Sequence, residues 1–313
     1  MKYYLIRLLR SVLTLLIVVT VVFLLMRMMP VEGYFGTNYD KLDELQKQAK
    51  LENLGLLDPW YIQLKDFYVS LLHGDLGQSI TYRPKVAIST IIGSKFLVSL
   101  RFGLASLSLS LVLGLSMGIL MARSKGKIWD KLGTGYVVGA NAVPAVIYYL
   151  LIQVFVTKWL DLPLLYEKVN MLSWILPVIC LSLVSTAYYA MWIRRYMVDE
   201  LNKDYIRLAR AKGLRNKTIM IKHVMRNAFV PMAQYLPASI LYTISGSIYV
   251  ESLFSIPGTG GLLVTAIQRQ DNTLVQALVL VYSSIGIIGL LLGDILMATF
   301  DPRIKLHNEG GSR

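Results

Sequence analysis

The chain has 313 residues, of which 55% are hydrophobic and only 16% are charged, and its formal net charge is +13. A soluble globular domain usually carries about 25% charged residues, so this composition excludes an ordinary soluble protein. The single cysteine, Cys180, excludes an intramolecular disulfide, and cysteine usage therefore says nothing about the redox compartment.

Six apolar runs are long enough to cross a bilayer, since a spanning helix needs roughly 20 mostly apolar residues. Helices are expected because they satisfy their backbone polar groups internally, whereas a barrel needs short alternating segments. The first run resembles a signal peptide, but it is long and no small-residue cleavage site follows Pro30. The sequence therefore predicts an all-α membrane protein with six transmembrane helices, at residues 11–29, 97–121, 134–157, 173–193, 232–254 and 277–299.

Positive charge is concentrated on one side of these spans. The short loops on the other side are poor in lysine and arginine, so the positive-inside rule makes the rich side cytoplasmic. We therefore expect both termini to be cytoplasmic, with residues 1–30 forming an N-terminal transmembrane helix. A charge excess of this kind does not indicate binding to nucleic acid. The rich segments are residues 2–10, 123–131, 194–226 and 303–313.

Residues 31–95 form the one sizeable segment expected outside the membrane. Asp58 is a good N-cap, Pro59 suits the first helical position, and His73-Gly74 fits a helix end. We expect this helix to lie on the membrane surface or to pack on the bundle, and docking of a partner is the alternative. Its apolar residues recur at helical spacing: Trp60, Leu64, Phe67, Tyr68, Leu71 and Leu72.

Small residues four apart occur in several predicted spans of residues 96–300, the expected helical core. Such pairs let two helix backbones approach each other closely in lipid. We interpret them as packing between helices of this chain rather than as evidence for a homodimer. The pairs are Gly114 and Gly118, Gly135 and Gly139, and Gly289 and Gly293.

The most informative segment is the basic loop at about residues 194–230, between two apolar runs. Strong helix formers predict a short helix over Asp204–Lys212, which Gly213 is placed to end. A second helix is expected to begin near Asn216, whose side chain is able to cap it. The expected apolar sides are Leu201, Tyr205 and Leu208 on the first helix, and Ile221, Met225 and Phe229 on the second.

Two interpretations of this loop stay open from its residues. A basic surface is attracted to anionic lipid by about 1 kcal/mol per basic residue near the membrane. Attraction to lipid alone does not require two helices broken at a glycine, or the mixture of alanine, leucine and tyrosine. A groove on a partner protein requires both, so the pattern favours docking to a protein.

The loop resembles the EAA loop of ABC-transporter permeases, in the form typical of the dipeptide and oligopeptide importers. Arg207 and Leu208 replace the first two residues of the general Glu-Ala-Ala pattern, and this departure is itself characteristic of the peptide branch. The matching residues are Asp204, Tyr205, Arg207, Ala209, Arg210, Ala211, Lys212, Gly213, His223, Arg226, Asn227 and Pro231.

The resemblance continues along most of the chain. The matching segments are LLMRMMP at 24–30, LGLLDPWYIQ at 54–63, GDLGQS at 74–79, ESLFSIPGTGGLL at 251–263 and DPRIK at 301–305. The chain departs from the family near residues 270–290, where Gln270-Asp271-Asn272-Thr273 replaces Arg-Asp-x-Pro and Leu290 replaces an asparagine. These departures weaken inferences about the sixth span and the gate.

The resemblance implies a type I importer permease with a MetI-like fold, an external segment after its first helix and a cytoplasmic tail at 301–313. It implies four kinds of partner: a second homologous permease, two cytoplasmic ATP-binding subunits, an extracytoplasmic substrate-binding protein and the lipid bilayer. The loop at 194–230 is then a coupling element that enters a groove of one ATPase. ATP and magnesium are bound by the ATPases, and no cofactor is expected in this chain.

One independent observation agrees that the chain is not an enzyme. It contains no Gly-x-x-x-x-Gly-Lys-[Ser/Thr] motif, and Gly126-Lys127 is followed by Ile128, which lacks the hydroxyl that binds magnesium. The histidines His73, His223 and His307 form no metal-ligand pattern. Energy is therefore expected to enter from a partner.

Charged residues within spans are costly, so Asp294 and Glu251 are the candidate pathway or gate residues. For Asp294 we weigh a latch to Arg194 or Arg195 against a carboxylate that reaches water or a neighbouring helix. For Glu251 we weigh a position facing the pathway against a structural bond to the loop at 255–261.

Three functions stay open. The leading one is a peptide-importer permease that forms half of a translocation pathway. A relative that moves nickel chelates, glutathione or another small solute is the alternative within transport. A self-sufficient channel or ion-coupled carrier is the alternative from another class, and it predicts transport by the purified chain alone.

Overall fold

The computed structural model describes residues 2–233, 235–245 and 247–300. Within these residues the chain is helical and forms no strand, and Gln78 and Ala87 make one isolated bridge. The predicted all-α class is confirmed. The cytoplasmic tail predicted at 301–313, with its DPRIK motif, lies outside the described residues.

Among the described residues, four helices are long and apolar enough to cross a membrane, and a bent pair raises the number to five. The four are α1 (Lys2–Arg27), α4 (Ile88–Arg123), α8 (Ile175–Leu201) and α15 (Asn272–Phe300). They agree with four of the predicted runs, although α4 begins nine residues before the predicted 97. The six-helix count stays a prediction.

The third and fifth predicted spans are interrupted rather than continuous. The third bends by 103° between α5 (Ile128–Ala142) and the segment Ala145–Leu160. Pro144 lies at this bend, where the absence of an N–H removes a helical hydrogen bond. That segment contains α6 (Ala145–Leu151), the π-helical turn η3 (Ile152–Val156) and α7 (Thr157–Leu160).

The fifth predicted run divides into three short helices, α11 (Arg226–Ala233), α12 (Leu236–Ser245) and α13 (Ile248–Leu253). Between α13 and α15 lies another short apolar helix, α14 (Thr259–Gln268). Composition alone did not predict these breaks, because an interrupted helix is as apolar as a continuous one.

Glycine brings α4 and α8 into backbone contact. A Cβ on Gly114 would lie 2.8 Å from the Thr186 carbonyl oxygen, and one on Gly118 would lie 2.5 Å from that of Ala190. Gly289 of α15 approaches Ala238 of α12 in the same way. The packing role is therefore confirmed for these positions. For Gly135 and Gly139 the packing role stays a prediction, because no described atom of this chain lies within 4 Å of a Cβ built on either.

The segment predicted to be external contains the 3₁₀ turns η1 (Val31–Tyr34) and η2 (Gly36–Lys41) and the helices α2 (Glu44–Asn53) and α3 (Trp60–Leu72). The start predicted for α3 is wrong, because Pro59 occupies the N-cap and no side chain caps the helix there. The predicted end is confirmed, since His73 is the C-cap and Gly74 has a φ of +73°.

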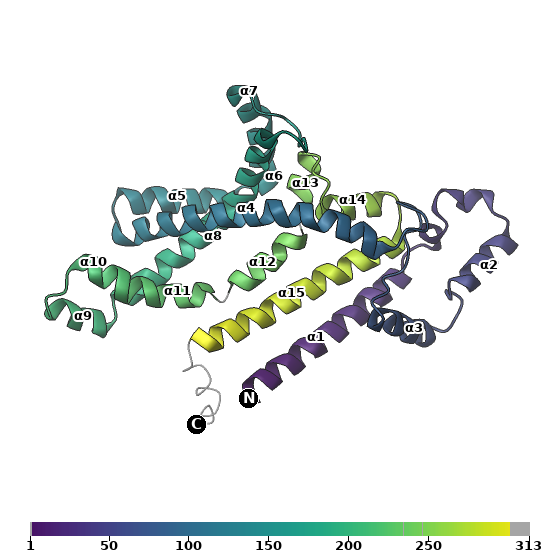
Figure 1. Cartoon of the computed structure of the whole chain (residues 1–313), viewed down its shortest axis with the longest axis horizontal. Coiled ribbons are helices and arrows are strands. Elements are labelled where there is room, and N and C mark those ends of the chain that lie inside the picture. The colour runs from purple at the N-terminus through teal and green to yellow at the C-terminus, as the bar shows by residue number, and fades with distance from the viewer. Residues whose placement is uncertain (1, 234, 246, 301–313) are drawn as a thin grey trace.

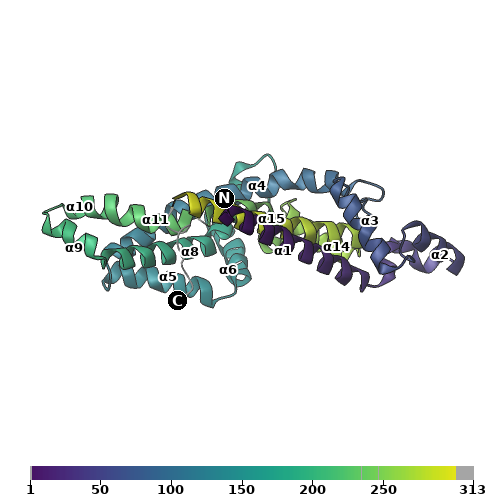
Figure 2. The same ribbon diagram turned by 90° about the horizontal axis from the view of Figure 1, so that it is seen from below.

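Helix α3 packs on α1, as the bundle-packing interpretation expects. The rings of Phe67 and Phe23 are 5.2 Å apart, and the Tyr68 hydroxyl lies 3.0 Å from the Leu16 carbonyl oxygen, to which it donates. Figures 1 and 2 show helix α2 and the basic loop at α9 and α10 at opposite ends of the long axis.

Candidate functional site

The basic loop consists of two helical segments that meet at a glycine. The first is α9 (Asp204–Ala211), and Gly213 follows it with a φ of +74°, a conformation that glycine adopts at little cost. The second begins with α10 (Asn216–Thr218), passes through the π-helical turn η5 (Ile219–Met225) and continues as α11. Arg215 is the N-cap rather than Asn216, so the predicted cap is wrong.

The face of α9 that packs inward differs from the predicted face. Ile206 and Ala209 are buried, whereas Tyr205 is 37% exposed and Leu208 is 56% exposed. Both sets follow helical spacing, and the sequence carries no signal that chooses between them. The buried pair belongs to one hydrophobic cluster with Met197 of α8.

The second segment is also rotated relative to the prediction. Its buried residues are Ile219, Val224 and Ala228, whereas Ile221 is 50% exposed. Phe229 is exposed and Met225 is only partly buried. A π-helical turn has more residues per turn than an α-helix, so a face assigned with a period of 3.6 residues is displaced beyond it.

Tyr205 holds the loop to the end of α8. Its hydroxyl donates to the Glu200 carboxylate and accepts from the Asn227 side-chain amide at 2.8 Å. Partial burial and the Glu200 carboxylate raise the pKa of Tyr205, so the phenol keeps its proton and its role as a donor. Tyr205 thus joins α8, α9 and α11.

The remaining predicted loop residues lie mostly on the surface. Arg207 pairs with Asp204 at 3.1 Å, and both side chains are exposed. Arg210, Ala211, Lys212 and Arg226 are exposed, and His223 is partly buried. The outer surface of α9 therefore combines cationic groups with the exposed Leu208, a mixture suited to a protein groove.

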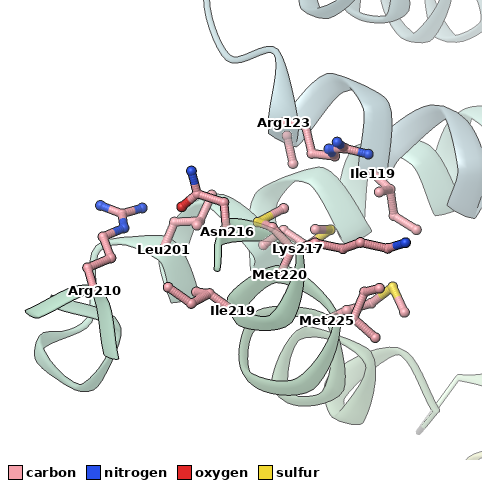
Figure 3. A pocket seen from close by; sticks show the side chains of 12 residues that line it. Ile119, Arg123, Leu201, Arg210, Asn216, Lys217, Ile219, Met220 and Met225 are labelled. Atoms are coloured by element: carbon pink, nitrogen blue, oxygen red, sulfur yellow. The ribbon is translucent and has the colours of Figure 1, made fainter. Parts of the chain in front are cut away.

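A cavity of about 690 Å³ lies at the base of this loop, and we call it the basic cavity. Figure 3 shows side chains from α4, α8, α9, α10 and η5 around it. Its cationic residues are Arg123, Arg210 and Lys217, and its methionines are Met197, Met220 and Met225.

Near the loop, a buried ion pair joins the first turn of α5 to α8. Asp130 is 5% exposed, and its oxygens lie 2.5 Å from Nε and 2.8 Å from Nη2 of Arg194. The Gly126 N–H donates to the same carboxylate at 2.8 Å. Sequence reasoning missed this pair because 64 residues separate its members.

Asp294 does not form the latch weighed for it. Its carboxylate lies 3.0 Å from Nη1 of Arg7 on α1, while Arg194 is held by Asp130. The alternative, a carboxylate that reaches a neighbouring helix, agrees with this contact. A charge near the end of an apolar helix is stabilised when it pairs in this way.

Glu251 forms a structural bond to the loop that follows it, which is one of the two alternatives weighed for it. It is 2% exposed and accepts from the Ser99 hydroxyl at 2.7 Å and from the Gly261 N–H at 3.0 Å. A Cβ on Gly258 would overlap the Glu251 carboxylate, which explains a glycine there. Glu251 also borders a cavity of about 270 Å³ with hydroxyl groups from Ser99, Ser106, Ser185, Tyr189, Ser239, Tyr242 and Ser247.

Asp271 is a buried anchor that sequence reasoning treated only as part of a departure from the family. It is 0% exposed and precedes α15. Its carboxylate accepts from the Ser79 hydroxyl at 2.6 Å and from the backbone N–H groups of residues 80–82 and 274. An aspartate just before an apolar helix is an N-cap signal that was available in the sequence.

These hydrogen bonds make Asp271 a source of acid sensitivity. Burial raises the pKa of Asp271, but the Ser79 hydroxyl and the backbone N–H groups outweigh it and hold the pKa below its ordinary value. A lowered pKa in the folded state adds stability above the unfolded-state pKa of about 3.9, and this stability disappears as the pH falls through the lower folded value.

We expect Asp271→Asn to lower the free energy of unfolding by about 1–3 kcal/mol at pH 7, because an amide leaves buried N–H groups without a charged acceptor. The difference from the wild type should narrow as the pH falls from about 4, where the carboxyl of the unfolded state takes up a proton, through the lower pKa of the folded state. Thermal unfolding of both proteins in detergent, from pH 7 to below about pH 4, measures this difference in the free energy of unfolding. Asp75→Asn, at an exposed aspartate in the same external region, is the control. A difference that stays constant at all pH values would contradict this account.

Comparisons with known proteins identify relatives across this region. A sequence model of the family described as binding-protein-dependent transport system inner membrane component matches residues 114–306. This range contains the basic loop, Glu251 and Asp294.

The curated relatives include permease proteins of peptide transport systems. The dipeptide transport system permease protein DppB of Lactococcus lactis is 33% identical, with 97% of this chain and 99% of DppB covered. The oligopeptide transport system permease protein OppB of Escherichia coli is 30% identical with the same coverage. The oligopeptide transport system permease protein AmiC of Streptococcus pneumoniae is 37% identical over 67% of this chain, a region that spans only 42% of AmiC.

Among solved structures, the chain resembles the crystal structure of an amino acid ABC transporter with histidines. The TM-score is 0.51 and the sequence identity is 16%, with 69% of this chain and 94% of that chain covered. At this identity the likeness concerns the fold alone.

Proposed function

Because the chain belongs to the family of binding-protein-dependent transport system inner membrane components, we propose that it is the permease subunit of an ATP-driven importer of dipeptides or oligopeptides. Membership makes it a transport component of the bacterial inner membrane rather than an ATPase. In the proposed importer the chain forms half of the translocation pathway, and a second homologous permease forms the other half.

The proposed membrane architecture has six transmembrane helices with both termini in the cytoplasm. Four long helices and one bent pair support five of these spans, and the broken series α11 to α13 supplies the sixth. The lysine- and arginine-rich segments support the orientation. In this arrangement 1–30 is the first span, 31–95 is extracytoplasmic, 96–300 is the permease core and 301–313 is a cytoplasmic tail.

The basic loop is the proposed coupling element to one of two cytoplasmic ATP-binding subunits. The observation that carries this assignment is the exposed surface of α9, where Arg207 and Leu208 lie on a helix whose inward residues, Ile206 and Ala209, are buried. A helix fixed by its own core is able to transmit a displacement of its tip to α8 and α11. ATP and magnesium are bound by the ATPases.

An extracytoplasmic binding protein delivers the substrate in this proposal, at the end of the molecule opposite the basic loop. Substrate choice then depends largely on that protein. The hydroxyl-lined cavity beside Glu251 is a candidate part of the pathway, since hydroxyl groups are able to hydrogen-bond a peptide backbone whatever its side chains.

Reconstitution in liposomes tests the proposed function. We expect peptide uptake only when this chain, a second permease, two ATPases and a binding protein are present together with ATP and magnesium. Uptake by the purified chain alone, without ATP, would instead establish a self-sufficient carrier.

A cysteine cross-link tests the docking surface directly. Leu208→Cys should cross-link to an ATPase subunit in the active complex, whereas Ala209→Cys should not, because Ala209 is 7% exposed and packs inward. The native Cys180 is buried and gives little background. If the two variants cross-link equally in an active complex, or if neither cross-links, the Leu208 face of α9 is not the docking surface.

A further inference from the structure

The basic cavity lies where two long apolar helices end. Arg123 is the last residue of α4 and Leu201 is the last residue of α8, and both residues line the cavity. Both helices are long and apolar enough to cross a membrane. The cavity therefore lies at the ends of two helices that are able to span the membrane, between these helices and the basic loop.

The polar lining of the cavity is cationic. Arg123, Arg210 and Lys217 come from α4, α9 and α10, and no carboxylate lines the cavity with them. Among the residues that the structure describes, no ion pair involves any of these three side chains. Figure 3 shows Arg210 approaching from one side, with Arg123 and Lys217 on the other.

The rest of the wall is mostly apolar. Met197, Met220 and Met225 line it, together with Ile219 and Leu201. Methionine side chains are flexible and adapt to an irregular apolar ligand. A cationic rim above an apolar wall suits an amphiphile with a negatively charged head, and it suits a small hydrophilic anion poorly.

We propose that the basic cavity binds one anionic phospholipid of the cytoplasmic leaflet. The phosphate group accepts hydrogen bonds from Arg123 and Lys217 on one side of the cavity, while Arg210 adds positive charge from the other side. The glycerol and the first part of the acyl chains lie against the methionine wall. The bound lipid then joins the end of a spanning helix to both halves of the loop. The proposal rests on the cytoplasmic placement of the loop and is independent of which substrate is transported.

Photocross-linking in vesicles tests this site. The full-length chain is placed in phosphatidylcholine vesicles that contain phosphatidylglycerol with a photoreactive group near its glycerol, and labelled peptides are identified by mass spectrometry. We expect labels within residues 216–225 and beside Arg123. Neutralising Arg123, Arg210 and Lys217 together to glutamine should reduce labelling by roughly tenfold or more for each hydrogen bond to the phosphate that is lost.

A matched control separates a site from general attraction to anionic lipid. Neutralising Arg207, Lys212 and Arg215 to glutamine removes the same charge from exposed loop positions that do not line the cavity. This control removes only the diffuse attraction, at most roughly fivefold for each charge, so it should lose much less labelling than the cavity variant. Met220→Trp, which fills the cavity without changing the charge, should lose its labelling.

Three outcomes would overturn the proposal. Equal loss in both triple variants means that the attraction is diffuse. Competition by free glycerol 3-phosphate as strong as that by phosphatidylglycerol assigns the cavity to a soluble phosphate. Loss of labelling when an ATPase subunit binds, with a protein cross-link in its place, assigns the cavity to protein docking.

Discussion

Gly213→Pro should abolish ATP-driven uptake in the assembled transporter while leaving the chain inserted in the membrane. Gly213 has a φ of +74°, and its N–H donates to the Arg210 carbonyl oxygen at 2.9 Å. Proline fixes φ near −65° and has no N–H, so it removes both features at a cost of about 3 kcal/mol or more. The two halves of the loop then lose the angle at which they meet.

Substitutions of graded severity at Gly213 separate backbone geometry from side-chain bulk. Nothing lies within 4 Å of a Cβ built at this position, so alanine meets no steric obstacle. Alanine in the left-handed conformation costs about 1–2 kcal/mol, whereas asparagine adopts it more readily. We expect uptake to fall in the order Gly, Asn, Ala, Pro, with ATP hydrolysis measured alongside. Uptake by Gly213→Pro at the wild-type rate would refute the role of the loop.

A charge introduced at residue 211, two positions before Gly213, tests the docking surface without altering the turn. Ala211 is exposed, and aspartate there places a negative charge beside Arg210 and Lys212. In the Gly213 experiments, Ala211→Asp serves as a variant that should uncouple uptake from ATP hydrolysis, and Ala211→Ser is its control. The Gly213 and Ala211 variants together show whether coupling requires both the backbone turn and the exposed surface.

Arg194→Ala should lower the free energy of unfolding by about 1–3 kcal/mol, because the arginine is the charged partner of a carboxylate that is 5% exposed. The guanidinium holds the Asp130 carboxylate through two contacts, and Asp130 is 5% exposed. Removing the arginine leaves a buried carboxylate with only the Gly126 N–H as a donor among the described contacts. Thermal or denaturant unfolding in detergent measures the loss.

Double substitution distinguishes the ion pair from simple packing. Asp130→Ala combined with Arg194→Ala should cost less than the sum of the two single changes, because neither charge is then left alone. Arg194→Lys should recover only part of the loss, since lysine cannot make two parallel hydrogen bonds to a carboxylate. The exposed pair of Asp204 and Arg207 is the control, and Asp204→Ala should cost less than about 1 kcal/mol. Strictly additive losses at 130 and 194 would contradict the assignment.

The basic loop shows which features a local sequence pattern predicts and which it does not. Helix propensity and the placement of Gly213 correctly predicted a helix, a turn and a second helix, because a helix start or a positive φ depends on neighbouring residues. The inward face of α9 was predicted wrongly, because Leu208 and Ala209 lie on adjacent stripes that both follow helical spacing. Only the packing of Met197 and its cluster against α9 selects Ala209.

The sequence by itself determined the all-helical class, four of the long apolar helices, the family and the helix–glycine–helix loop, since each depends on composition or short-range periodicity. Tertiary structure alone decided the pairings between distant residues. Asp130 meets Arg194, Asp294 meets Arg7, and Asp271 meets Ser79 from 192 residues away. The sequence does not show which donor pairs with a given carboxylate. A buried carboxylate needs a partner, but the packing of the helices determines which donors lie close to it.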